Sequence, residues 1–560
     1  MLLWRFTKFK PAQSPTIPPN PIAARPCFYH DHVMTQGPYP IELLTTVQMA
    51  QADRLAIAGG VPSMTLMDNA AAAITRTANQ ILQKSSGRRV LVLCGPGNNG
   101  GDGYVAARLL RSARIKVRVA ALTPRENLRG DALTAAAAWD GSVEPAETCC
   151  FEGADLVVDA LFGAGLARDI DGPAAELVTR LNKWRRESRQ HVVAVDMPSG
   201  IDGTTGAVRG VAVEADATVT FFRLKSGHLL LPGRLHCGAL TCAHIGIRAG
   251  VLADIAPDIF VNAPGFWLDA LPFPSVEGHK FSRGHALVIS GGASFTGAAR
   301  LAATAALRAG AGLVTLASPK DAMAINAGAL TSVMLREADD APALKGLLAD
   351  PRINAVALGP GLGVSALTRE KVETVLAGGS AARGFVLDAD ALTSFADEPE
   401  RLWLAIKAAP GPVVLTPHAG EFARLFNPKG LSPSGAPLSK LDKARAAARE
   451  SGAILLFKGP DTVVAAPDGR ATIVSYASPW LATAGSGDTL TGIIAGLLAQ
   501  GMAPLAAASC GAWMHARAAA IFGPGLVADD ITATLPAVWR ELVSELDGAE
   551  RPGFTPLSRR

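Results

Sequence analysis

The chain has 560 residues, too many for one hydrophobic core, because single cores stop growing near ~250–300 residues. Hydrophobic residues make up 49% of the chain and charged residues 18%, which excludes wholesale disorder. The 53 Lys and Arg residues exceed the 49 Asp and Glu residues by only 4, so the charge gives no reason to expect a nucleic-acid partner. The 7 cysteines are too sparse for a disulfide scaffold, and we therefore expect a reducing, cytoplasmic setting.

Glycine is abundant, with 57 residues, while aromatic residues make up only 6% of the chain. Such a sequence can pack backbones closely and can bring main-chain N–H groups up to a bound ligand. The composition therefore hints at phosphate-binding loops, and the motifs must show where these lie.

The first 38 residues are rich in proline, and we interpret them as a disordered lead-in, with Met34 as an alternative start. This stretch lacks a long apolar core followed by a small-residue cleavage site, which argues against a secretory signal. An organelle transit peptide stays open as the alternative because of its basic residues, which are Arg5, Lys8, Lys10 and Arg25.

Residues 39–248 alternate helical stretches with short apolar strands, which predicts a parallel sheet covered by helices on both faces. Ligands bind beyond the carboxyl ends of such strands, where Cys94, Asp159 and Asp196 fall. The predicted helices are 48–58 and 104–114, and the predicted strands are 89–94, 117–122, 156–159 and 192–196.

The glycine-rich run from Gly95 to Gly103 separates a predicted strand from a predicted helix. Glycines there let backbone N–H groups face an anion, and Asn98, Asn99 and Asp102 add polar groups. The spacing matches neither a Walker loop nor the dinucleotide motif G-x-G-x-x-G, and a plain tight turn stays open as the alternative.

Two further strand ends carry carboxylates, Asp159 and Asp196, and Ser199 follows the second of them. Two carboxylates and an amide at one sheet edge could hold a hard cation through oxygen ligands. A carboxylate could instead act as a general acid or base, and either aspartate alone could be a helix N-cap.

Three motifs together resemble the NAD(P)H-hydrate epimerase family over about residues 40–247: Asn-Asn-Gly-Gly-Asp-Gly at 98–103, Val-Asp-Ala-Leu-Phe-Gly at 158–163 and Asp-Met-Pro-Ser-Gly at 196–200. The resemblance implies interconversion of the R and S forms of hydrated NADH and NADPH. It also implies that Asp196 contacts the hydrate and performs proton transfer, and that Asn99, Asp159 and Ser199 coordinate K⁺. The other implied substrate-binding residues are Asn98, Asn99, Gly100, Gly101, Asp102, Gly163, Ala164, Gly165, Leu166, Ala167, Arg168 and Asp169.

The proline-rich stretch 249–280 lacks strong periodicity, and we interpret it as the junction between two halves. A second α/β pattern covers residues 281–547. The uncharged stretch 489–514 is long enough to span a membrane, but glycines and Pro504 interrupt it, so we expect two buried helices broken at 501–504 and no membrane partner. The predicted strands of this half are 284–290, 313–317, 355–358, 384–387, 413–415 and 453–457.

The run 483–488 precedes an apolar helix of the second half. Gly485 and Gly487 would let N–H groups cradle a phosphate at the helix N-terminus. Asp488 would lie beside the phosphoryl group and could take a proton from an attacking hydroxyl, with a plain glycine-rich N-cap as the alternative. Lys458 ends a strand and fits either a nucleotide phosphate or solvent, and His418 lies next to a turn, where it could be structural.

Three motifs resemble the ribokinase-like NAD(P)H-hydrate dehydratase family over about residues 275–545: Gly-Pro-Gly-Leu-Gly at 359–363, Thr-Pro-His-Ala-Gly-Glu-Phe at 416–422 and Gly-Ser-Gly-Asp at 485–488. The implied contacts to the hydrate are Ala298, Gly361, Gly363, His418, Gly420, Glu421 and Asp488. The implied contacts to ADP or ATP, which would bring Mg²⁺, are Lys458, Gly459, Pro460, Asp461, Thr462, Gly485, Ser486 and Gly487. Pro460 departs from the family, which often has a further Gly or Ala after the Lys-Gly pair.

Together the resemblances imply two three-layer α/β/α domains, the first Rossmann-like and the second ribokinase-like. They imply an isomerase fused to a lyase, acting on NADHX and NADPHX with ADP or ATP, and a homo-oligomer because relatives of both halves self-associate. Asp488 would deprotonate the ring hydroxyl of the S hydrate, which would attack the terminal phosphoryl group before phosphate leaves. The alternative is a ribokinase-like small-molecule kinase fused to a non-catalytic binding module.

Overall fold

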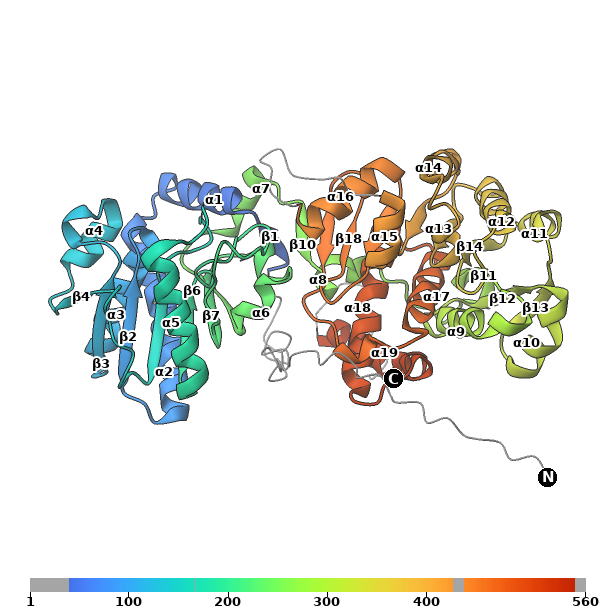
Figure 1. Cartoon of the computed structure of the whole chain (residues 1–560). Coiled ribbons are helices and arrows are strands. Elements are labelled where there is room, and N and C mark those ends of the chain that lie inside the picture. Colours follow the sequence, from blue (N-terminus) through green and yellow to red (C-terminus); the bar gives the residue numbers. More distant parts are fainter. Residues whose placement is uncertain (1–39, 167, 427–437, 549–560) are drawn as a thin grey trace, which may run out of the picture.

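The computed structural model describes residues 40–548 except residue 167 and residues 427–437. The predicted lead-in and the alternative start at Met34 lie outside these residues. Two α/β domains follow each other along the chain and lie side by side (Figure 1). Every predicted strand is present, with ends that differ from the prediction by at most two residues. The predicted fold class, two α/β domains with helices on both faces of each sheet, is confirmed.

A seven-stranded sheet, in which all neighbouring strands are parallel, forms the first domain. Alternate residues of β2 (Arg89–Cys94) face opposite sides of the sheet: Val90 and Val92 pack under α1 (Thr46–Ala58), α2 (Ser63–Ser85) and α3 (Asn98–Ser112), while Leu91 and Leu93 pack under α5 (Gly172–Ser188). In sheet order the strands are β4 (Val143–Pro145), β3 (Lys116–Ala121), β2 (Arg89–Cys94), β5 (Leu156–Ala160), β6 (His191–Val195), β7 (Ala217–Phe221) and β9 (Ala239–Ala243). The helices are α1 (Thr46–Ala58), α2 (Ser63–Ser85), α3 (Asn98–Ser112), α4 (Gly130–Ala137), α5 (Gly172–Ser188), α6 (Gly233–Cys237) and α7 (Leu252–Ile255).

A sheet of 12 strands organises the second domain. From β13 to β17 its neighbouring strands are parallel, and β18 and β19 then form an antiparallel edge. In sheet order these strands are β13 (Met334–Glu337), β12 (Leu313–Ser318), β11 (His285–Ile289), β14 (Ile353–Leu358), β15 (Gly384–Leu387), β16 (Val413–Leu415), β17 (Ile454–Phe457), β18 (Val463–Ala465) and β19 (Ala471–Ile473).

Helices cover both faces of this second sheet, as the near-continuous apolar strands require. One face packs against α9 (Thr296–Arg308), α17 (Ser486–Ala499), α18 (Pro504–Phe522) and α19 (Ala528–Gly548). The other packs against α11 (Ala341–Leu348), α12 (Ala366–Ala377), α14 (Pro399–Ala408) and α16 (Lys440–Ser451). Helices α17 and α18 are the two buried helices expected from residues 489–514, and within the described part of the chain no helix is long and apolar enough to cross a membrane.

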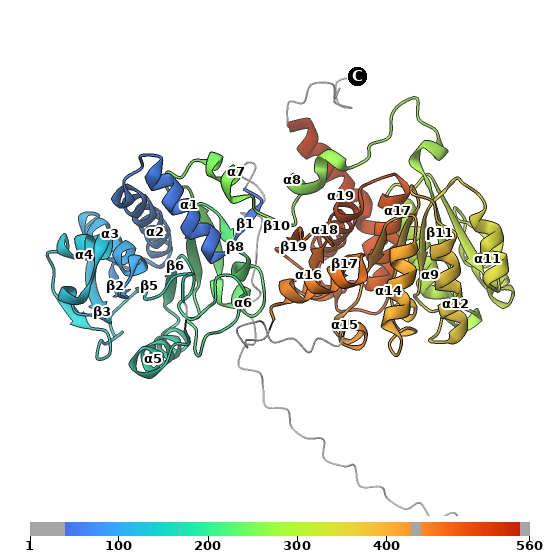
Figure 2. The same ribbon diagram turned by 90° about the horizontal axis from the view of Figure 1, so that it is seen from above.

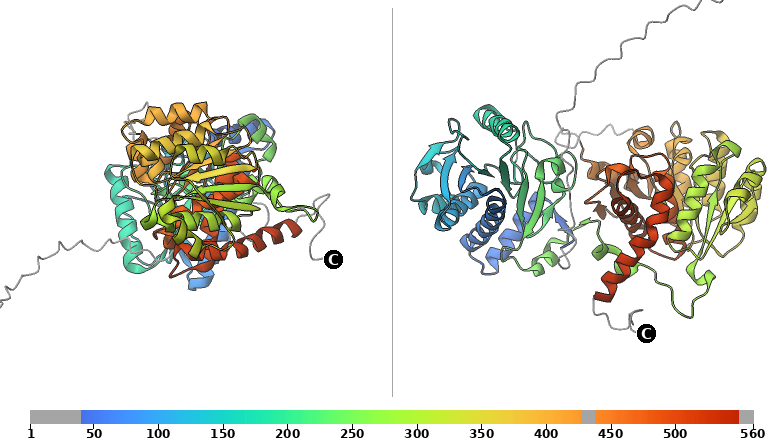
Figure 3. Two further views of the ribbon diagram at one scale, coloured as in Figure 1. Left: turned by 90° about the vertical axis from the view of Figure 1, so that its right-hand side faces the viewer. Right: turned by 90° about the horizontal axis from the view of Figure 1, so that it is seen from below.

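The three strands at the end of the large sheet, β10, β1 and β8 in sheet order, join the two domains. Figures 2 and 3 show the two domains from above and below. Strand β10 (Ile259–Val261) comes from the predicted junction and pairs with β19. Strands β1 (Glu42–Leu44) and β8 (Leu224–Lys225) come from the first half of the chain, and β1 lies between β10 and β8. The predicted junction 249–280 therefore includes a strand of the sheet, and the large sheet extends to the edge of the first domain.

Glycine permits the closest helix pairing in the second domain, between α17 and α9. A Cβ atom at Gly492 would overlap the carbonyl oxygen of Ala302. We therefore expect Gly492→Ala to destabilise the second domain by about 1–3 kcal/mol, the usual penalty of overpacking. Gly346 of α11 has open space around it, so Gly346→Ala serves as the matched control and is expected to be neutral or slightly stabilising. Thermal unfolding of both variants checks this, and equal Tm values would contradict it.

Candidate functional site

The glycine-rich motif of the first domain forms the first two turns of α3, which begins at Asn98 with Gly97 as its N-cap. The sequence had placed the helix from 104, because glycine disfavours helix. Packing overrides that preference: a side chain at Gly100 would overlap the backbone of Gly95, and one at Gly103 would come within 2.7 Å of the Ala160 Cβ. The motif thus places a helix N-terminus at the carboxyl edge of the sheet, where its free N–H groups favour an anion.

Asp159 and Ser199 form one buried pair, each with no exposed surface. The Ser199 Oγ donates to the Asp159 Oδ1 at 2.6 Å, and the Ser199 N–H donates to Oδ2 at 2.8 Å. The Phe162 N–H donates to the Ser199 Oγ at 2.8 Å. Burial nevertheless raises the pKa of Asp159 to about 6. Asp159 therefore anchors two neighbouring loops and is not a helix N-cap.

Asn99 and Asp196 converge over Gly163. A Cβ atom at Gly163 would lie 2.9 Å from the Asn99 Oδ1 and 3.2 Å from the Asp196 Oδ2. The Asn99 Nδ2 is buried, and the described residues give it no hydrogen-bond partner. Only glycine therefore fits at this position, where the backbone comes close to an amide and a carboxylate.

Asp196 follows β6 with a φ of 63°, a left-handed conformation that is strained for a residue other than glycine. Its Oδ2 accepts from the Ala164 N–H at 3.0 Å, and its Oδ1 accepts from the Lys225 Nζ at 2.6 Å and the Thr220 Oγ1 at 2.9 Å. Burial would raise the pKa of Asp196, but the charge and hydrogen bond of Lys225 outweigh it and lower the pKa to about 2. Asp196 is therefore an ionised carboxylate, and not a helix cap.

Two further carboxylates face Asp196. Burial and the charge of Asp196 raise the pKa of Asp53, on α1, to about 6, although Lys225 opposes the shift. Burial, Asp196 and Asp53 raise the pKa of Asp102 well above its usual value. Sequence reasoning missed Asp53 and Lys225, because no glycine motif marks either of them.

The other predicted substrate-binding residues divide by position. Gly100 and Gly101 are buried in α3, whereas Asn98 is exposed at its first position. Gly165, Arg168 and Asp169 are exposed and Leu166 is half-buried, and Ala167 lies outside the described residues. The structure thus gathers Asn99, Asp102, Gly163, Ala164 and Asp196, and the other predicted contacts stay predictions.

Lys458 is the centre of the second site. It follows β17, and its side chain is 19% exposed. Its Nζ donates to the Asp388 Oδ1 at 2.7 Å and lies 3.9 Å from the Glu421 Oε2. The Thr491 Oγ1 donates to the Asp388 Oδ2 at 2.8 Å. Lys458 is therefore held among carboxylates and is not a solvated side chain.

Asp488 lies in the first turn of α17, beside this cluster. Burial and Asp388 raise the pKa of Asp488 to about 6, with Lys458 opposing the shift. Helix α17 begins at Ser486, three residues earlier than predicted, after Gly485 in a left-handed conformation with a φ of 84°. A Cβ atom at Gly487 would lie 3.4 Å from the Lys458 Nζ. A carboxylate, an ammonium group and free helix N–H groups thus meet at one point, a geometry suited to a phosphoryl group.

His418 and Glu421 begin α15 (Ala419–Phe426). The His418 Nδ1 accepts from the Gly420 N–H at 2.9 Å, and the Glu421 Oε2 accepts from the His418 N–H at 2.8 Å. Burial raises the pKa of Glu421. The His418 ring nitrogen therefore caps the helix, which is the structural role that the sequence left open.

The remaining predicted residues of the second site form two groups. A Cβ atom at Gly361 would lie 3.8 Å from the Ala298 Cβ, and the Gly363 N–H donates to the Asp390 Oδ2 at 2.8 Å. Gly459 and Thr462 close a turn, because the Thr462 Oγ1 donates to the Gly459 carbonyl at 2.7 Å.

Pro460 and Asp461, predicted to bind nucleotide, contact the first domain. The Leu231 N–H donates to the Asp461 Oδ2 at 3.0 Å, and the Arg234 Nη1 donates to the Pro460 carbonyl at 3.0 Å. The Lys440 Nζ donates to the Asp461 Oδ1 at 2.7 Å.

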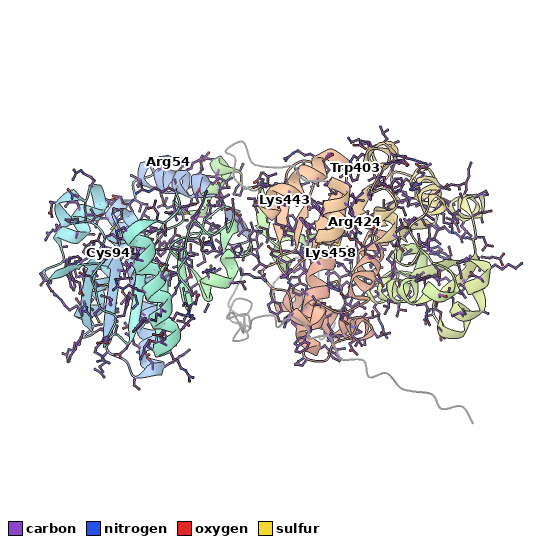
Figure 4. The ribbon with its side chains drawn as sticks, viewed as in Figure 1. Arg54, Cys94, Trp403, Arg424, Lys443 and Lys458 are labelled. Carbon is purple, nitrogen blue, oxygen red and sulfur yellow. The ribbon has the colours of Figure 1, made fainter. Side chains whose placement is uncertain are left out.

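Figure 4 places Cys94 in the first domain and Lys458 in the second, so the two strand-end sites lie in separate domains.

Known families match both halves of the chain. A family model described as NAD(P)H-hydrate dehydratase matches residues 286–535, and one described as YjeF-related protein N-terminus matches residues 63–227. The bifunctional NAD(P)H-hydrate repair enzyme Nnr of Moorella thermoacetica is 37% identical, covering 90% of this chain and 98% of its own length. This chain belongs to the family of bifunctional NAD(P)H-hydrate repair enzymes.

A second curated relative and a solved structure are also similar to this chain. The Escherichia coli enzyme of the same name is 32% identical over 84% of this chain and 88% of its own length. A solved structure of the ADP/ATP-dependent NAD(P)H-hydrate dehydratase from Bacillus subtilis, co-crystallised with ATP and Mg²⁺, is 28% identical and covers 50% of this chain and 98% of its own, with a TM-score of 0.42. The two family models and the curated relatives confirm the family resemblances seen in the sequence for both halves.

Proposed function

We propose that the first domain interconverts the R and S forms of hydrated NADH and NADPH, and that the second dehydrates the S form at the expense of ADP or ATP. Family membership over 90% of the chain supports both activities. The observation that carries the proposal is that each domain holds a carboxylate beside a lysine at the carboxyl edge of its sheet. The two activities fit one chain, because the first supplies the epimer that the second consumes.

In the second domain, Asp488 acts as the base. Its pKa of about 6 leaves it largely ionised at neutral pH and matches it to proton transfer. It takes the proton of the ring hydroxyl, whose oxygen bonds to the terminal phosphorus as the bond to the nucleotide oxygen breaks. Lys458 and the N–H groups of α17 bind the phosphoryl oxygens, and Mg²⁺ bound with the nucleotide would neutralise further phosphate charge.

Loss of phosphate completes the dehydration. Hydroxide is a poor leaving group and phosphate a good one, which explains why a dehydration consumes a nucleotide. The carbon–oxygen bond breaks with its electron pair on the phosphate, and loss of a proton from the adjacent ring carbon restores the dihydropyridine. The nicotinamide ring would lie beside Gly363, where a side chain would meet no atom within 4 Å.

In the first domain, Asp196 acts as a base towards the hydrate, because it is ionised throughout the neutral range. Its second oxygen lies close to Gly163 and Asn99 and accepts from the Ala164 N–H. The helix N-terminus at Asn98 lies at the same edge and suits the phosphates of the dinucleotide.

Asn99, Asp159 and Ser199 would hold K⁺ in this domain. Their donor atoms are oxygens, the ligands that a hard cation prefers, and the buried carboxylate of Asp159 accepts its hydrogen bonds from neutral groups of Ser199 and Leu161. Within the described residues no group of three or more His, Cys, Asp or Glu side chains could hold a metal, so a site of this mixed type fits the domain better than a transition-metal site. When bound, the ion would supply positive charge beside the loop that carries Asp196.

The proposal is tested with the complete chain, hydrated NADH and either ADP or ATP. Return of NADH absorbance measures dehydration, and chromatographic separation of the epimers without nucleotide measures interconversion. Both are expected. No NADH with either nucleotide would contradict the dehydratase, and an unchanged epimer ratio beyond the spontaneous rate would contradict the epimerase.

Lys458→Met is expected to lower dehydration about 10²-fold or more, because it removes the charge that faces the phosphoryl group. It should also shift the acid limb of the pH–rate profile to higher pH, because Lys458 lowers the pKa of Asp488 and its loss would raise that pKa. Steady-state kinetics between pH 5 and 9 measures both effects. Lys443→Met, on the partly exposed face of α16, is the matched control, and equal loss in both variants would contradict the assignment.

A further inference from the structure

Lys225 is one of the largest fully buried side chains of the described structure, with 1% of its surface exposed. Lysine is almost never fully buried unless it is paired. Its Nζ donates to the Asp196 Oδ1 at 2.6 Å and to the Thr220 Oγ1 at 2.8 Å. Thr220 in turn donates to the same carboxylate oxygen at 2.9 Å. The ammonium group is therefore directed at one oxygen of Asp196, which leaves the other oxygen towards Gly163.

The backbone around Lys225 is fixed to the backbone of Asp196. Lys225 pairs with Leu44 through β8 and β1, and its N–H donates to the His228 Nδ1 at 2.9 Å. Because Nδ1 accepts, the ring proton lies on Nε2, which donates to the Asp196 carbonyl at 2.8 Å. Burial and Lys225 lower the pKa of His228 to about 4, so the ring is neutral. His228 thus joins the two main chains without adding charge.

We propose that Lys225 is a positioning residue of the epimerase site, which holds Asp196 in one orientation and as the charged carboxylate that takes a proton from the hydrate. With 1% exposure, Lys225 does not itself reach the substrate. The inference rests on the proposed epimerase function. Asp196 has a strained, left-handed backbone, and its carboxylate contacts Lys225 of β8.

The groups that face Asp196 show why the cation is needed. Asp53 on α1 and Asp102 on α3 are acidic, His228 is neutral, and the buried Cys242 thiol on β9 has a pKa raised to about 11 and so carries no charge. Among the charged neighbours of Asp196, Lys225 lowers its pKa the most, and Arg54 lowers the pKa of Asp53. Without Lys225, burial and two neighbouring carboxylates would all favour protonated Asp196.

Lys225→Met in the complete chain tests the inference. Epimerisation at neutral pH is expected to fall about 10²-fold or more, mainly in kcat, because a protonated Asp196 no longer accepts a proton. The epimerisation rate should recover as pH rises, so the acid limb of the pH–rate profile lies at higher pH than in the unaltered chain. Dehydration of the pure S epimer, measured on the same sample, reports that the second domain is folded and is expected to be unchanged, and recovery of epimerisation at higher pH reports that the first domain is folded.

Lys225→Arg keeps the charge and is expected to keep the position of the acid limb, even if the larger side chain lowers the rate. A Lys225→Met chain that dehydrates normally and keeps the unaltered pH profile would overturn the inference. If Lys225→Met also loses dehydration, the inference is tested with Lys225→Arg instead. An acid limb of the Lys225→Arg pH profile that shifts to higher pH, although the charge is retained, would overturn the inference. Failure of the unaltered chain to interconvert the epimers would instead contradict the proposed epimerase function.

Discussion

Asp488→Asn is expected to lower dehydration by about 10²–10⁴-fold while the chain still interconverts the R and S epimers. The asparagine keeps the size of the side chain but cannot take the proton of the ring hydroxyl. It also leaves Lys458 its ion pair with Asp388, so the nucleotide site is expected to remain and the KM for ADP or ATP to change little. Single-turnover measurement with the S epimer gives the rate of the chemical step.

The matched control for this prediction is Asp529→Asn, an exposed carboxylate in the first turn of another long helix, α19. It should leave both activities as they are. The unaltered chain should also lose dehydration as pH falls through about 6, because the raised pKa of Asp488 means that its basic form is present only above that range. Dehydration by Asp488→Asn within threefold of the unaltered chain would remove Asp488 from the mechanism.

Asp196→Asn is expected to abolish epimerisation, with a loss of about 10²–10⁴-fold, because an amide does not accept the proton. The change also leaves the buried Lys225 without its counterion, and breaking a buried pair in this way costs about 3–5 kcal/mol. Two measurements are therefore needed: the rate at which pure R epimer is converted, and the Tm.

Asp155→Asn is the control for Asp196→Asn. Asp155 directly precedes a strand of the first sheet and, like Asp196, pairs with a basic side chain, but its partner Arg89 is 57% exposed. Exposed pairs contribute about 0–1 kcal/mol, so little change is expected in either stability or epimerisation. If Asp196→Asn epimerises as fast as Asp155→Asn, Asp196 is not the base.

The strand ends of both sites could be predicted because buried parallel strands leave a clear sequence pattern. Apolar runs bounded by glycine or aspartate located Cys94, Asp159, Asp196 and Lys458, and all of them follow or end strands as expected. The start of α3 was wrong, because local propensity excludes glycine from helices while the close approach of Gly95 and Gly100 requires it.

The partners of these residues could not be predicted. Lys225 reaches Asp196 only because the two-residue strand β8 pairs with β1, from a distant part of the sequence, and no periodicity marks so short a strand. Asp53 faces the site because α1 folds over the sheet edge, which its own sequence does not show. Asp388 follows the predicted strand 384–387, but its ion pair with Lys458, 70 residues further along the chain, depends on the order of the strands in the sheet.

The contact between the two domains could not be predicted from the sequence either. The motif resemblance assigned Pro460 and Asp461 to the nucleotide, whereas the structure uses the Pro460 carbonyl and the Asp461 carboxylate to bind Arg234 and Leu231. Sequence motifs report one domain at a time, and the joining strands of the large sheet belong to both. Nucleotide contacts at these two residues therefore stay a prediction.

The most direct test of two separate, successive sites is the amount of NADH recovered from a mixture of R and S hydrates with excess ADP. The unaltered chain is expected to convert both epimers to NADH. Asp488→Asn should yield almost none, and Asp196→Asn should convert the S fraction quickly and then proceed only at the spontaneous rate of epimerisation. Rapid conversion of the R fraction by Asp196→Asn would contradict the account.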